Sequence, residues 1–529
     1  MFKILVCDPI SEQGVDMLRQ HPNVQVDVKL KQTEDAICEM AADYHALIVR
    51  SETKITEKIL EKAANLKVVG RAGVGIDNIN VDAATQRGVV VVNTPDGNTI
   101  SACEHTMALL LAMARNVPQA QQSLKEGRWD RSKYMGVELR GKKIGVLGFG
   151  KIGAEVAVRC RAFGMDILAY DPYITEERAQ QFHVRLCTKE EIFREADYIT
   201  VHMPKTAETK NMIAKGEFDL MKPTARVLNV ARGGIINEQD LYEALVQNKI
   251  AGAAIDVFEK EPQTDSPLFQ LPQVVATPHL GASTEEAQVQ VAQDVAEEII
   301  RVLNGELVHN AANIPFMKPE LAKKMEPFMA LAEKLGKVSN YIAEGPIQKV
   351  EIKYTGDVPK QEELRPLTNT LMKALLRPAL GYAVNYVNAP VVAKERGIKI
   401  TVTQENQSQD YVNQMTVTIR DQKGKTHSIG GSVFQNGEIH IIQIDEFNLD
   451  IRPEGHLLLA PHRNQPKVVG PVGMILGDAG VNISGMQVSR ENKEGFSLMV
   501  LTLDSMAPED VVRKLEQIPA IRKAIYVEF

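Results

Sequence analysis

The chain has 529 residues, which predicts three or four domains and excludes a small disulfide-stapled module. Its 44% hydrophobic and 24% charged residues are ordinary values for a globular protein. With 61 Lys and Arg against 68 Asp and Glu, the net charge of -7 argues against non-specific binding of nucleic acid, while a local basic pocket stays compatible with it.

The first 310 or so residues alternate short β-branched runs with helical patterns, which predicts a parallel sheet covered on both faces. The runs expected as strands are Lys3–Cys7, Ala46–Val49, Lys67–Val69 and Val89–Asn93. Ser101 and Glu104 have the spacing of a capping box that opens a buried helix, and Pro118 should end or kink the first part of this helix.

A second series of apolar runs begins at Lys142. Six of them, KIGVL, DILAY, YITV, RVLNV, AAIDVF and VVATP, follow one another at 20–30-residue spacing, as a doubly wound nucleotide-binding domain requires. A second capping-box pattern, Ser283 with Glu286, is expected to open a long helix that ends near Leu303.

The remaining third of the chain has a different texture. Residues 317–344 form an amphipathic helical pattern, and the alternating runs Ile398–Gln404 and Met415–Arg420 predict an α+β region. From Gly455 onward the predicted order is βαββαβ, which is typical of a ferredoxin-like unit.

The five cysteines include no CxxC pair, so neither a disulfide framework nor a thiolate zinc site is expected, and no metal site is predicted. The N-terminal apolar run meets Asp8 at once, and no apolar stretch of about 18 residues occurs, so neither a signal peptide nor a membrane span is expected. We therefore predict a protein of the reducing cytoplasm.

A glycine-rich turn provides the first chemical motif. Gly148, Gly150 and Gly153 form GxGxxG between a strand and a helix, and Asp171 ends the next strand. The glycines permit the tight turn, the approach of backbone to a pyrophosphate, and close packing of helix on strand. An acid at the position of Asp171 suits ribose hydroxyls and repels a 2′-phosphate. The motif predicts NAD rather than NADP; a plain packing turn is the alternative.

Three further residues follow strands of the same predicted sheet: Arg232, Glu261 and His279. Each alone is more often a surface or structural residue. At the carboxyl ends of strands, however, all three could face one crevice. Oxidation of an alcohol needs a cation for the substrate, a base for the hydroxyl proton and a carboxylate that orients the base.

The segments GFGKIG, NVARGGIINE, DVFEKEP and TPHLGAST resemble the D-2-hydroxyacid dehydrogenase family. VGRAGVGIDNI, TPDGNTISACEH and the C-terminal unit are similar to its long members that act on 3-phosphoglycerate. The resemblance implies NAD-dependent oxidation of 3-phospho-D-glycerate to 3-phosphohydroxypyruvate, the first step of L-serine biosynthesis. His279 would be the acid/base, Glu261 its partner and Arg232 the carboxylate anchor.

The resemblance also implies a domain layout. The fold would be α/β, with two Rossmann-like doubly wound domains followed by an α+β domain and a ferredoxin-like domain of the ACT type. The expected bounds are 1–98 with 283–314 for a discontinuous substrate-binding domain, 99–282 for the NAD-binding domain, 317–452 for an intervening regulatory domain, and 455–529 for the ACT domain.

The same resemblance implies two sets of binding residues. Cofactor contacts are expected at Val74, Gly148, Gly150, Lys151, Ile152, Gly153, Asp171, Met203, Val230, Ala231, Arg232, Asp256, His279, Leu280, Gly281 and Ala282. Substrate contacts are expected at Arg50, Arg71, Asn98, Arg131 and Arg232, and Arg131 would reach the site of a neighbouring subunit.

For the C-terminal unit, the resemblance suggests a serine site at His462, Asn464 and Asn482. Lys467 departs from the glycine that commonly follows Pro466 in such units, and a purely structural or oligomerising role is the alternative. The family implies a homo-oligomer, either a dimer or a tetramer. Two other functions stay open: a dehydrogenase of another small 2-hydroxy acid, such as 2-hydroxyglutarate or the glyoxylate type, and an NAD-sensing corepressor-like protein.

Overall fold

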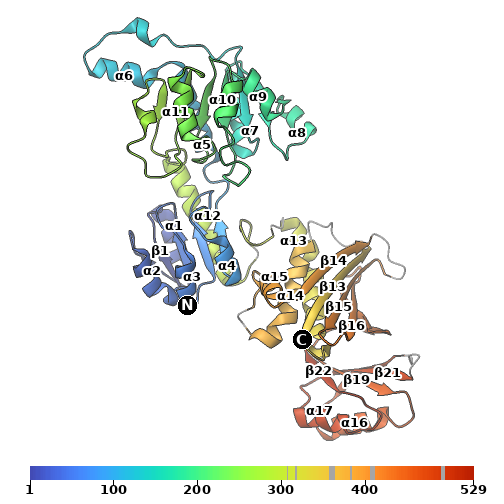
Figure 1. The fold of residues 1–529 in the computed structure, drawn as a ribbon. Coiled ribbons are helices and arrows are strands. Elements are labelled where there is room, and N and C mark those ends of the chain that lie inside the picture. Colours follow the sequence, from blue (N-terminus) through green and yellow to red (C-terminus); the bar gives the residue numbers. More distant parts are fainter. Residues whose placement is uncertain (307, 316–318, 357–363, 382–383, 406–410, 490–494) are drawn as a thin grey trace.

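The computed structural model describes residues 1–529 except 307, 316–318, 357–363, 382–383, 406–410 and 490–494. Its described strands form four sheets, and each sheet with the helices that cover it is called a unit, numbered first to fourth from the N-terminus. Figure 1 shows the first two units stacked with α12 between them, and the third and fourth units following on one side.

The first unit is built on a five-stranded parallel sheet in the order β2-β1-β3-β4-β5. Every residue of β3 is buried, as expected for a parallel strand covered on both faces. The strands are β1 (Phe2–Val6), β2 (Val24–Val28), β3 (Ala46–Val49), β4 (Val68–Arg71) and β5 (Val90–Asn93). The helices are α1 (Glu12–Arg19), α2 (Glu34–Met40), η1 (Ala41–Asp43), α3 (Glu57–Lys62) and α4 (Val81–Gln86).

The second unit has a seven-stranded parallel sheet in the order β12-β11-β10-β9-β6-β7-β8. The strand order reverses at β6, which pairs with both β7 and β9, and this is the point where open α/β sheets bind nucleotides. The strands are β6 (Lys143–Leu147), β7 (Asp166–Tyr170), β8 (Arg185–Leu186), β9 (Tyr198–Val201), β10 (Arg226–Asn229), β11 (Gly252–Ile255) and β12 (Val274–Ala276).

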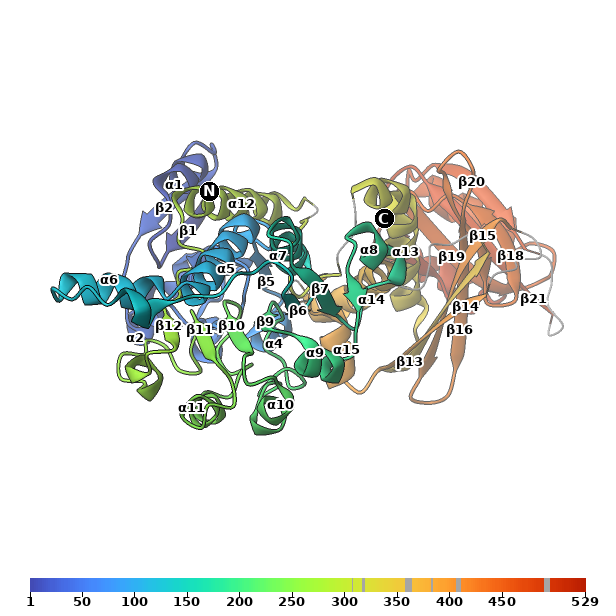
Figure 2. The ribbon, with the colours of Figure 1, turned by 90° about the horizontal axis from the view of Figure 1, so that it is seen from above.

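Helices cover both faces of this sheet and enclose two separate hydrophobic cores. In Figure 2, α5 and α7 lie on one face and α9, α10 and α11 on the other. The helices of this region are α5 (Thr99–Ala114), α6 (Val117–Lys125), η2 (Arg131–Tyr134), α7 (Lys151–Ala162), α8 (Glu176–Gln181), α9 (Lys189–Glu195), α10 (Lys215–Leu220), α11 (Glu238–Val246) and η3 (Pro267–Gln270).

The helix α12 (Glu285–Asn304) follows the second sheet in sequence but packs on the first. A Cβ on Gly14 would lie 2.5 Å from the carbonyl oxygen of Ala292, and one on Gly70 would lie 2.6 Å from Val295. These glycines let the helix approach the first unit closely. The chain therefore crosses between the two units twice, before α5 and before α12.

The third unit has a six-stranded sheet in the order β14-β13-β15-β16-β17-β18, in which only β13 and β14 pair in parallel. Its elements are α13 (Pro319–Ile342), β13 (Ile347–Gly356), α14 (Leu364–Leu380), α15 (Ala389–Glu395), β14 (Lys399–Glu405), β15 (Asn413–Asp421), β16 (Thr426–Val433), β17 (Ile439–Ile444) and β18 (Phe447–Ile451).

The fourth unit is an antiparallel sheet in the order β20-β21-β19-β22. It comprises β19 (His456–Arg463), α16 (Val469–Asp478), β20 (Ile483–Val488), β21 (Phe496–Leu503), α17 (Glu509–Glu516) and β22 (Ile525–Glu528). This βαββαβ order and the two parallel sheets confirm the predicted fold class. In the described part of the chain, no helix is long and apolar enough to cross a membrane.

The predicted capping boxes are wrong in their details. The helix α5 begins at Thr99, and the Ser101 hydroxyl instead meets Thr284 Oγ1 at 2.7 Å. The N-cap of α12 is Thr284 rather than Ser283, and its side chain accepts from Ala287 N–H. For α12 the neighbouring threonine supplies the cap, whereas the side chain of Asn98, the N-cap residue of α5, makes no capping bond, so the pattern located each helix but not its first residue.

Candidate active site

A histidine–carboxylate pair lies at the carboxyl edge of the second sheet. His279 Nδ1 lies 2.7 Å from Glu261 Oε2, and the other oxygen of Glu261 accepts from Phe258 N–H at 2.9 Å. Since an ionised carboxylate only accepts, Nδ1 carries the proton, and Nε2 of neutral His279 is left as an acceptor. The two predicted residues are thus brought together in the arrangement that a general base needs.

The backbone at His279 is unusual, with a φ of 54° in the left-handed region. Its N–H donates to the carbonyl oxygens of Asp256 and Thr277 at 2.8 and 3.0 Å. The Asp256 carboxylate then accepts from the N–H groups of Leu280 and Gly281 at 2.8 and 2.9 Å. These bonds hold the loop in a conformation that a free chain would rarely adopt.

Asp256 is fully buried, and His105 and Thr277 complete its environment. Thr277 Oγ1 donates to Asp256 Oδ1 at 2.6 Å, and His105 Nε2 lies 3.2 Å from the same oxygen and 3.1 Å from Thr277 Oγ1. Because the hydroxyl proton is used on the carboxylate, His105 Nε2–H donates to both oxygens. No motif singled out His105, since it lies on α5 and 151 positions from its partner.

Two acids of this region have shifted pKa values. Burial raises the pKa of Glu261, but the hydrogen bonds from His279 and Phe258 N–H outweigh it, so the pKa lies below its usual value. The same balance holds for Asp256, where hydrogen bonds from His105, Thr277 and two backbone N–H groups lower the pKa against burial. Both carboxylates are therefore charged near neutral pH.

Arg232 lies where three loops meet. Its Nε donates to Asp77 Oδ2 at 3.1 Å, and a Cβ on Gly75 would fall 1.8 Å from its Nη2. A Cβ on Gly233 would fall 1.8 Å from the carbonyl oxygen of Phe258, next to the Glu261 loop. The glycines therefore allow the first unit to touch Arg232 and allow the segment of Arg232 to pack against the backbone that precedes Glu261.

Arg71 and Arg50 extend this positive charge into the first unit. Burial, together with the charges of Arg232 and Arg50, lowers the pKa of Arg71 to about 10. The Nε of Arg71 is buried without a hydrogen-bond partner, and so is Oδ1 of Asn98, the N-cap residue of α5. Three arginines that repel one another and an unpaired donor form a site that an anion would stabilise.

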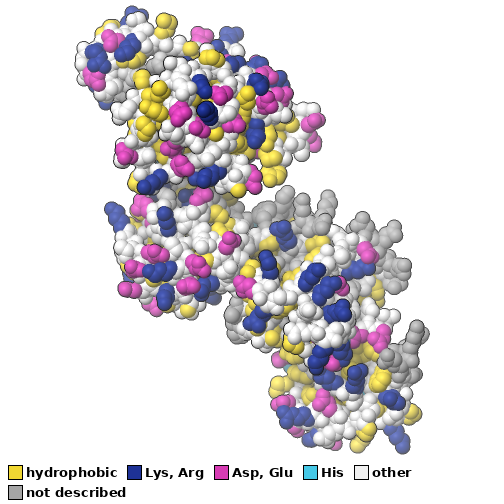
Figure 3. Space-filling view, viewed as in Figure 1, with side chains coloured by type: hydrophobic (Ala, Val, Ile, Leu, Met, Phe, Trp, Pro, Cys, Tyr) yellow, Lys and Arg dark blue, Asp and Glu magenta, His cyan; other side chains and the backbone are white. Residues whose placement is uncertain are grey.

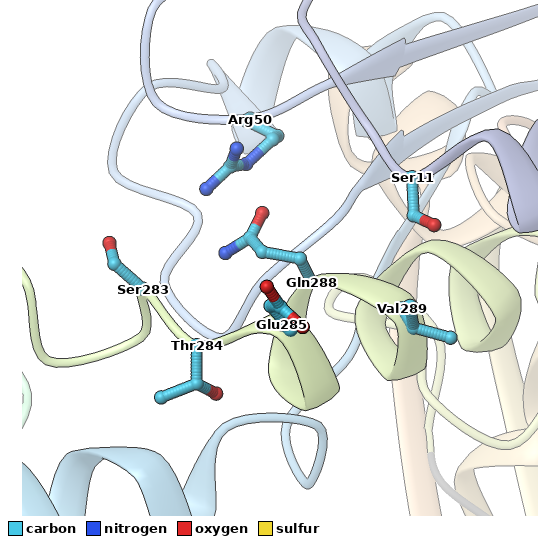
Figure 4. A pocket seen from close by; sticks show the side chains of 7 residues that line it. All are labelled: Ser11, Arg50, Ser283, Thr284, Glu285, Gln288 and Val289. Carbon is cyan, nitrogen blue, oxygen red and sulfur yellow. The ribbon is translucent and has the colours of Figure 1, made fainter.

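Arg50 also lines a cavity of about 610 Å³ between the end of β3 and the start of α12. In Figure 4 its guanidinium points toward Gln288 of α12, with Ser283 on the loop that leads to this helix. The Arg50 N–H donates to the buried Asp8 at 2.6 Å, which fixes the end of β3. Ser283 and Thr284 of its wall follow His279 closely in sequence, and the cavity opens toward solvent.

The glycine loop fits a dinucleotide. Gly148 has a φ of 94°, and a Cβ there would lie 2.5 Å from the carbonyl oxygen of His202. A Cβ on Gly153 would meet Gly148 O at 2.1 Å, whereas Gly150 faces open space. The N-cap Gly150 offers no capping side chain, so the first N–H groups of α7 are available for a pyrophosphate. Asp171 accepts from Phe149 and Tyr173 N–H and retains lone pairs for ribose hydroxyls.

The other predicted cofactor residues have different neighbours, and of these Met203 lies beside the glycine loop. Met203 lies 2.6 Å from a Cβ placed on Gly148, and Val230 lies 3.0 Å from one on Gly281. The carbonyl of Val74 already accepts from Asn93 at 2.5 Å. Lys151 forms an ion pair with Asp96, and Ile152 packs on the adjacent core. Ala231 N–H donates to Asn229, and the carbonyl of Ala282 accepts from Gln288. The side chain of Leu280 is exposed.

Some predicted residues do not join this site. Arg131 is exposed on η2, beyond α6, and is absent from the charges that act on Arg71. His462 is buried on β19 with Nδ1 3.0 Å from Ala460 O, while Asn482 donates to Asp504 at 2.5 Å. Because β21 separates β19 from β20, His462 and Asn464 do not meet Asn482 within one chain. Lys467 has a φ of 68°, which explains the preference for glycine there.

Taken together, the site can hold an anion on arginines, remove a proton with His279 and bind NAD along the glycine loop. When bound, NAD supplies the hydride acceptor. Among the described residues, no group of His, Cys, Asp and Glu could hold a metal ion.

Comparisons with known proteins agree with this geometry. Residues 107–281 match the NAD-binding domain of D-isomer-specific 2-hydroxyacid dehydrogenases, and residues 324–445 match the D-3-phosphoglycerate dehydrogenase intervening domain. The chain is 44% identical to a D-3-phosphoglycerate dehydrogenase of Synechocystis sp., over 100% of this chain and 95% of that protein. A relative of the same name from Archaeoglobus fulgidus is 43% identical over 99% of this chain and 100% of that protein.

Solved structures are similar over the dehydrogenase part. D-lactate dehydrogenase from Aquifex aeolicus, complexed with NAD and lactic acid, has a TM-score of 0.54 and 25% identity over 59% of this chain and 98% of that chain. NAD-dependent formate dehydrogenase from Staphylococcus aureus, in complex with NAD, has a TM-score of 0.53 and 29% identity over 58% and 97%. The chain thus belongs to the D-3-phosphoglycerate dehydrogenase family, within the D-2-hydroxyacid dehydrogenases, and is an NAD-dependent oxidoreductase.

Proposed function

We propose that the enzyme oxidises 3-phospho-D-glycerate to 3-phosphohydroxypyruvate with NAD, the entry step of L-serine biosynthesis. The observation that carries this proposal is the arginine cluster of Arg50, Arg71 and Arg232, with the buried Nε of Arg71 lacking a partner. A substrate with a carboxylate at one end and a phosphate at the other needs cations at two points, and guanidinium groups bind both oxyanions in a bidentate manner. The relatives from Synechocystis sp. and Archaeoglobus fulgidus are named D-3-phosphoglycerate dehydrogenase, which agrees with this substrate.

In this proposal each side chain has a separate task. Arg232 holds the substrate carboxylate and polarises the C2 oxygen, while Arg71 and Arg50 receive the phosphate end, with Asn98 as a polar contact. Nε2 of His279 takes the C2 hydroxyl proton as the hydride leaves. Glu261 orients the imidazole through Nδ1 and stabilises the imidazolium that forms. Asp171 disfavours the 2′-phosphate of NADP.

A substrate comparison tests this function. NADH formation is followed at fixed NAD with 3-phosphoglycerate, D-glycerate, 2-hydroxyglutarate and D-lactate. We expect kcat/KM for 3-phosphoglycerate to exceed the others at least about 100-fold, since each unmatched charge costs on the order of 1.5–3 kcal/mol. A higher kcat/KM for 2-hydroxyglutarate would favour a dehydrogenase of another small acid, and no turnover at all would favour an NAD-sensing binding protein.

An arginine variant provides the matched control. Arg71→Lys keeps the charge but loses Nε, and should raise KM for 3-phosphoglycerate while leaving KM for NAD unchanged. Arg140→Lys, on a loop before β6, is the control and should change neither. Equal effects of the two variants would contradict the assignment of Arg71.

We also propose a homo-oligomer, dimer or tetramer, acting in the cytoplasm and sensing L-serine through the fourth unit. Large apolar side chains are exposed on and after α6, including Trp129 at 77% and Met135 at 81%, which supports a partner surface there. All five cysteines are free thiols, as in a reducing compartment. The residues predicted to bind serine lie on both sides of β21, with His462 and Asn464 on one side and Asn482 on the other, so the proposed serine site would need a second chain.

Light scattering and serine titration test these statements. A mass of one chain would refute the oligomer, and Trp129→Glu should shift the mass toward the monomer. Unchanged activity at saturating serine would refute the sensing proposal, and Asn464→Ala should remove any inhibition without changing kcat in its absence.

A further inference from the structure

A cavity of about 460 Å³ lies between the third and fourth units, far along the chain from the arginine cluster. One wall is formed by the start of β16 and the turn between β17 and β18, and the other by β19, β21 and the segment before β22. Beside the cavity the two units share a hydrophobic core, in which Leu457 and Val527 of the fourth unit are buried with residues of α13 and of the third sheet. A bound molecule would contact both.

Much of the cavity wall is apolar. Ile444 and Phe447 come from the third unit, and Leu459 and Leu498 from the fourth, and all four are buried. Ile525 adds a partly buried side chain at the start of β22. Such a surface favours a ligand with a hydrocarbon body rather than a compact polar ion.

Three cations and three acids line the cavity, and within the described part of the chain two of the cations have no partner at ion-pair distance. Lys425 pairs with Glu344, and Asp445 accepts from the His427 ring at 2.9 Å. Among the described residues, Arg522 and Lys523 make no ion pair. Figure 3 shows Lys and Arg side chains gathered where the third and fourth units meet.

The acids of the cavity are already engaged. The hydrogen bond from Lys425 lowers the pKa of Glu344, and the charges of Lys425, His427 and Lys523 add to this effect. The second oxygen of Asp445 accepts from Ser428 N–H at 2.9 Å, and Glu446 has an interaction of its own. Arg522 and Lys523 therefore have no direct ion-pair partner among the described residues of the cavity, and the charge of Lys523 acts on Glu344 without a salt bridge.

His427 adds an unpaired polar atom. Its Nδ1 faces Asp445, whereas its Nε2 is buried and has no hydrogen-bond partner. A buried nitrogen without a partner is unfavourable unless a ligand or water bonds to it. The ring can accept from a ligand donor when neutral or donate to an anion when protonated.

We propose that this cavity binds a small organic acid, with its carboxylate on Arg522 and Lys523 and its hydrocarbon body against Ile444, Phe447 and Leu498. The ligand is distinct in chemistry from the phosphorylated hydroxy acid of the active site, because its apolar body is needed for binding. Because it touches strands of both units, it favours one relative position of the two.

Calorimetric titration of the full-length protein, saturated with NADH to fill the nucleotide site, tests this inference. The probes are 3-phenylpropionate, inorganic phosphate, and 3-phenyl-1-propanol, which has the body without the charge. We expect 3-phenylpropionate to bind, and the other two to bind at least about tenfold more weakly. In R522Q/K523Q its affinity should fall at least about tenfold, a loss of about 1.4 kcal/mol.

The control variant removes two positive charges from the fourth unit, as R522Q/K523Q does. R513Q/K514Q changes two cations of α17 that pair with Glu509 and Asp510 outside the cavity, and it should bind 3-phenylpropionate like the wild type. I525W keeps every charge but fills the cavity, and should abolish binding. No binding of 3-phenylpropionate at about 10 mM, equal affinity in R522Q/K523Q and the control, or equal binding of phosphate would each overturn the proposal.

Discussion

His105 contacts neither the glycine loop nor the arginine cluster, yet its removal should slow the reaction. His105→Leu deletes the Nε2–H that donates to Asp256 Oδ1 and Thr277 Oγ1 and leaves the volume largely filled. A hydrogen bond to a charged acceptor contributes about 1.5–3 kcal/mol, which corresponds to a factor of about 10 to 150 if all of it acts on the loop.

The structure indicates the lower part of that range. Asp256 keeps three other donors, from Thr277, Leu280 and Gly281, so the loop loses one of four restraints. His279 has a φ of 54°, so a loosened loop would relax away from the productive geometry rather than toward it. We therefore expect kcat to fall about tenfold, because small displacements of a catalytic group are costly.

Steady-state kinetics with both substrates provides the assay. KM for 3-phosphoglycerate should stay within about twofold, because the arginine cluster lies on other loops. His105→Gln is the matched variant: its amide N–H reaches about as far as Nε2 and should restore most of kcat. Wild-type kcat in His105→Leu, or a His105→Gln enzyme as slow as His105→Leu, would refute the reasoning.

Three further predictions concern single side chains. Glu261→Gln should lower kcat about 10- to 100-fold with KM for NAD unchanged. The folded-state pKa of Glu261 lies below its ordinary value near 4.5, so its charge stabilises the fold above that pH, and this stability is lost as pH falls through the folded pKa. The thermal stabilities of the wild type and Glu261→Gln should therefore converge in acid. A difference that stays constant with pH would contradict this. Asp171→Ala should reduce the NAD-to-NADP ratio of kcat/KM at least about tenfold, and an unchanged ratio would reject its role. Lys467→Gly should raise the free energy of unfolding of the fourth unit by about 0.5–1 kcal/mol in calorimetry, because its φ is 68°, and a loss of stability would show that the lysine side chain contributes more than the strained backbone costs.

The parts of the fold that the sequence predicts well are those with local signals. Strands such as β3 and β6 are continuous apolar runs bounded by polar residues, and Gly148 and Gly153 have steric reasons that are visible in the motif itself. By contrast β2 and β8 were not predicted. β2 (VQVDV) lies at the sheet edge and has partly buried and exposed residues, and β8 is two residues long, so neither has a clear burial pattern.

Within the candidate site, the sequence predicts a set of residues, of which the structure brings Glu261 and His279 together, but it does not predict how they are held. Glu261 and His279 are 18 positions apart and their pairing follows from strand-end placement, whereas the bond of His105 to Asp256 joins residues 151 positions apart. Arg232 and Asp77 are 155 positions apart and lie on different units. Such contacts depend on how separate segments pack against one another, and neither the hydrophobic periodicity nor the composition of a segment predicts that packing.

The contact between the first and third units follows the same logic and extends it beyond the catalytic part. Asn385 donates to Gly88 O at 2.7 Å, and a Cβ on Gly88 would fall 2.2 Å from this amide. Gly88 lies just before β5, and Asn93 at the end of β5 donates to the carbonyl of Val74 on the loop that touches Arg232. One short strand therefore has a contact with the third unit just before its start and a contact with the loop of Val74 and Gly75 at its end. Because β5 is paired with β4 along its whole length, these two contacts are joined by one short hydrogen-bonded strand, although they lie on segments far apart in the sequence.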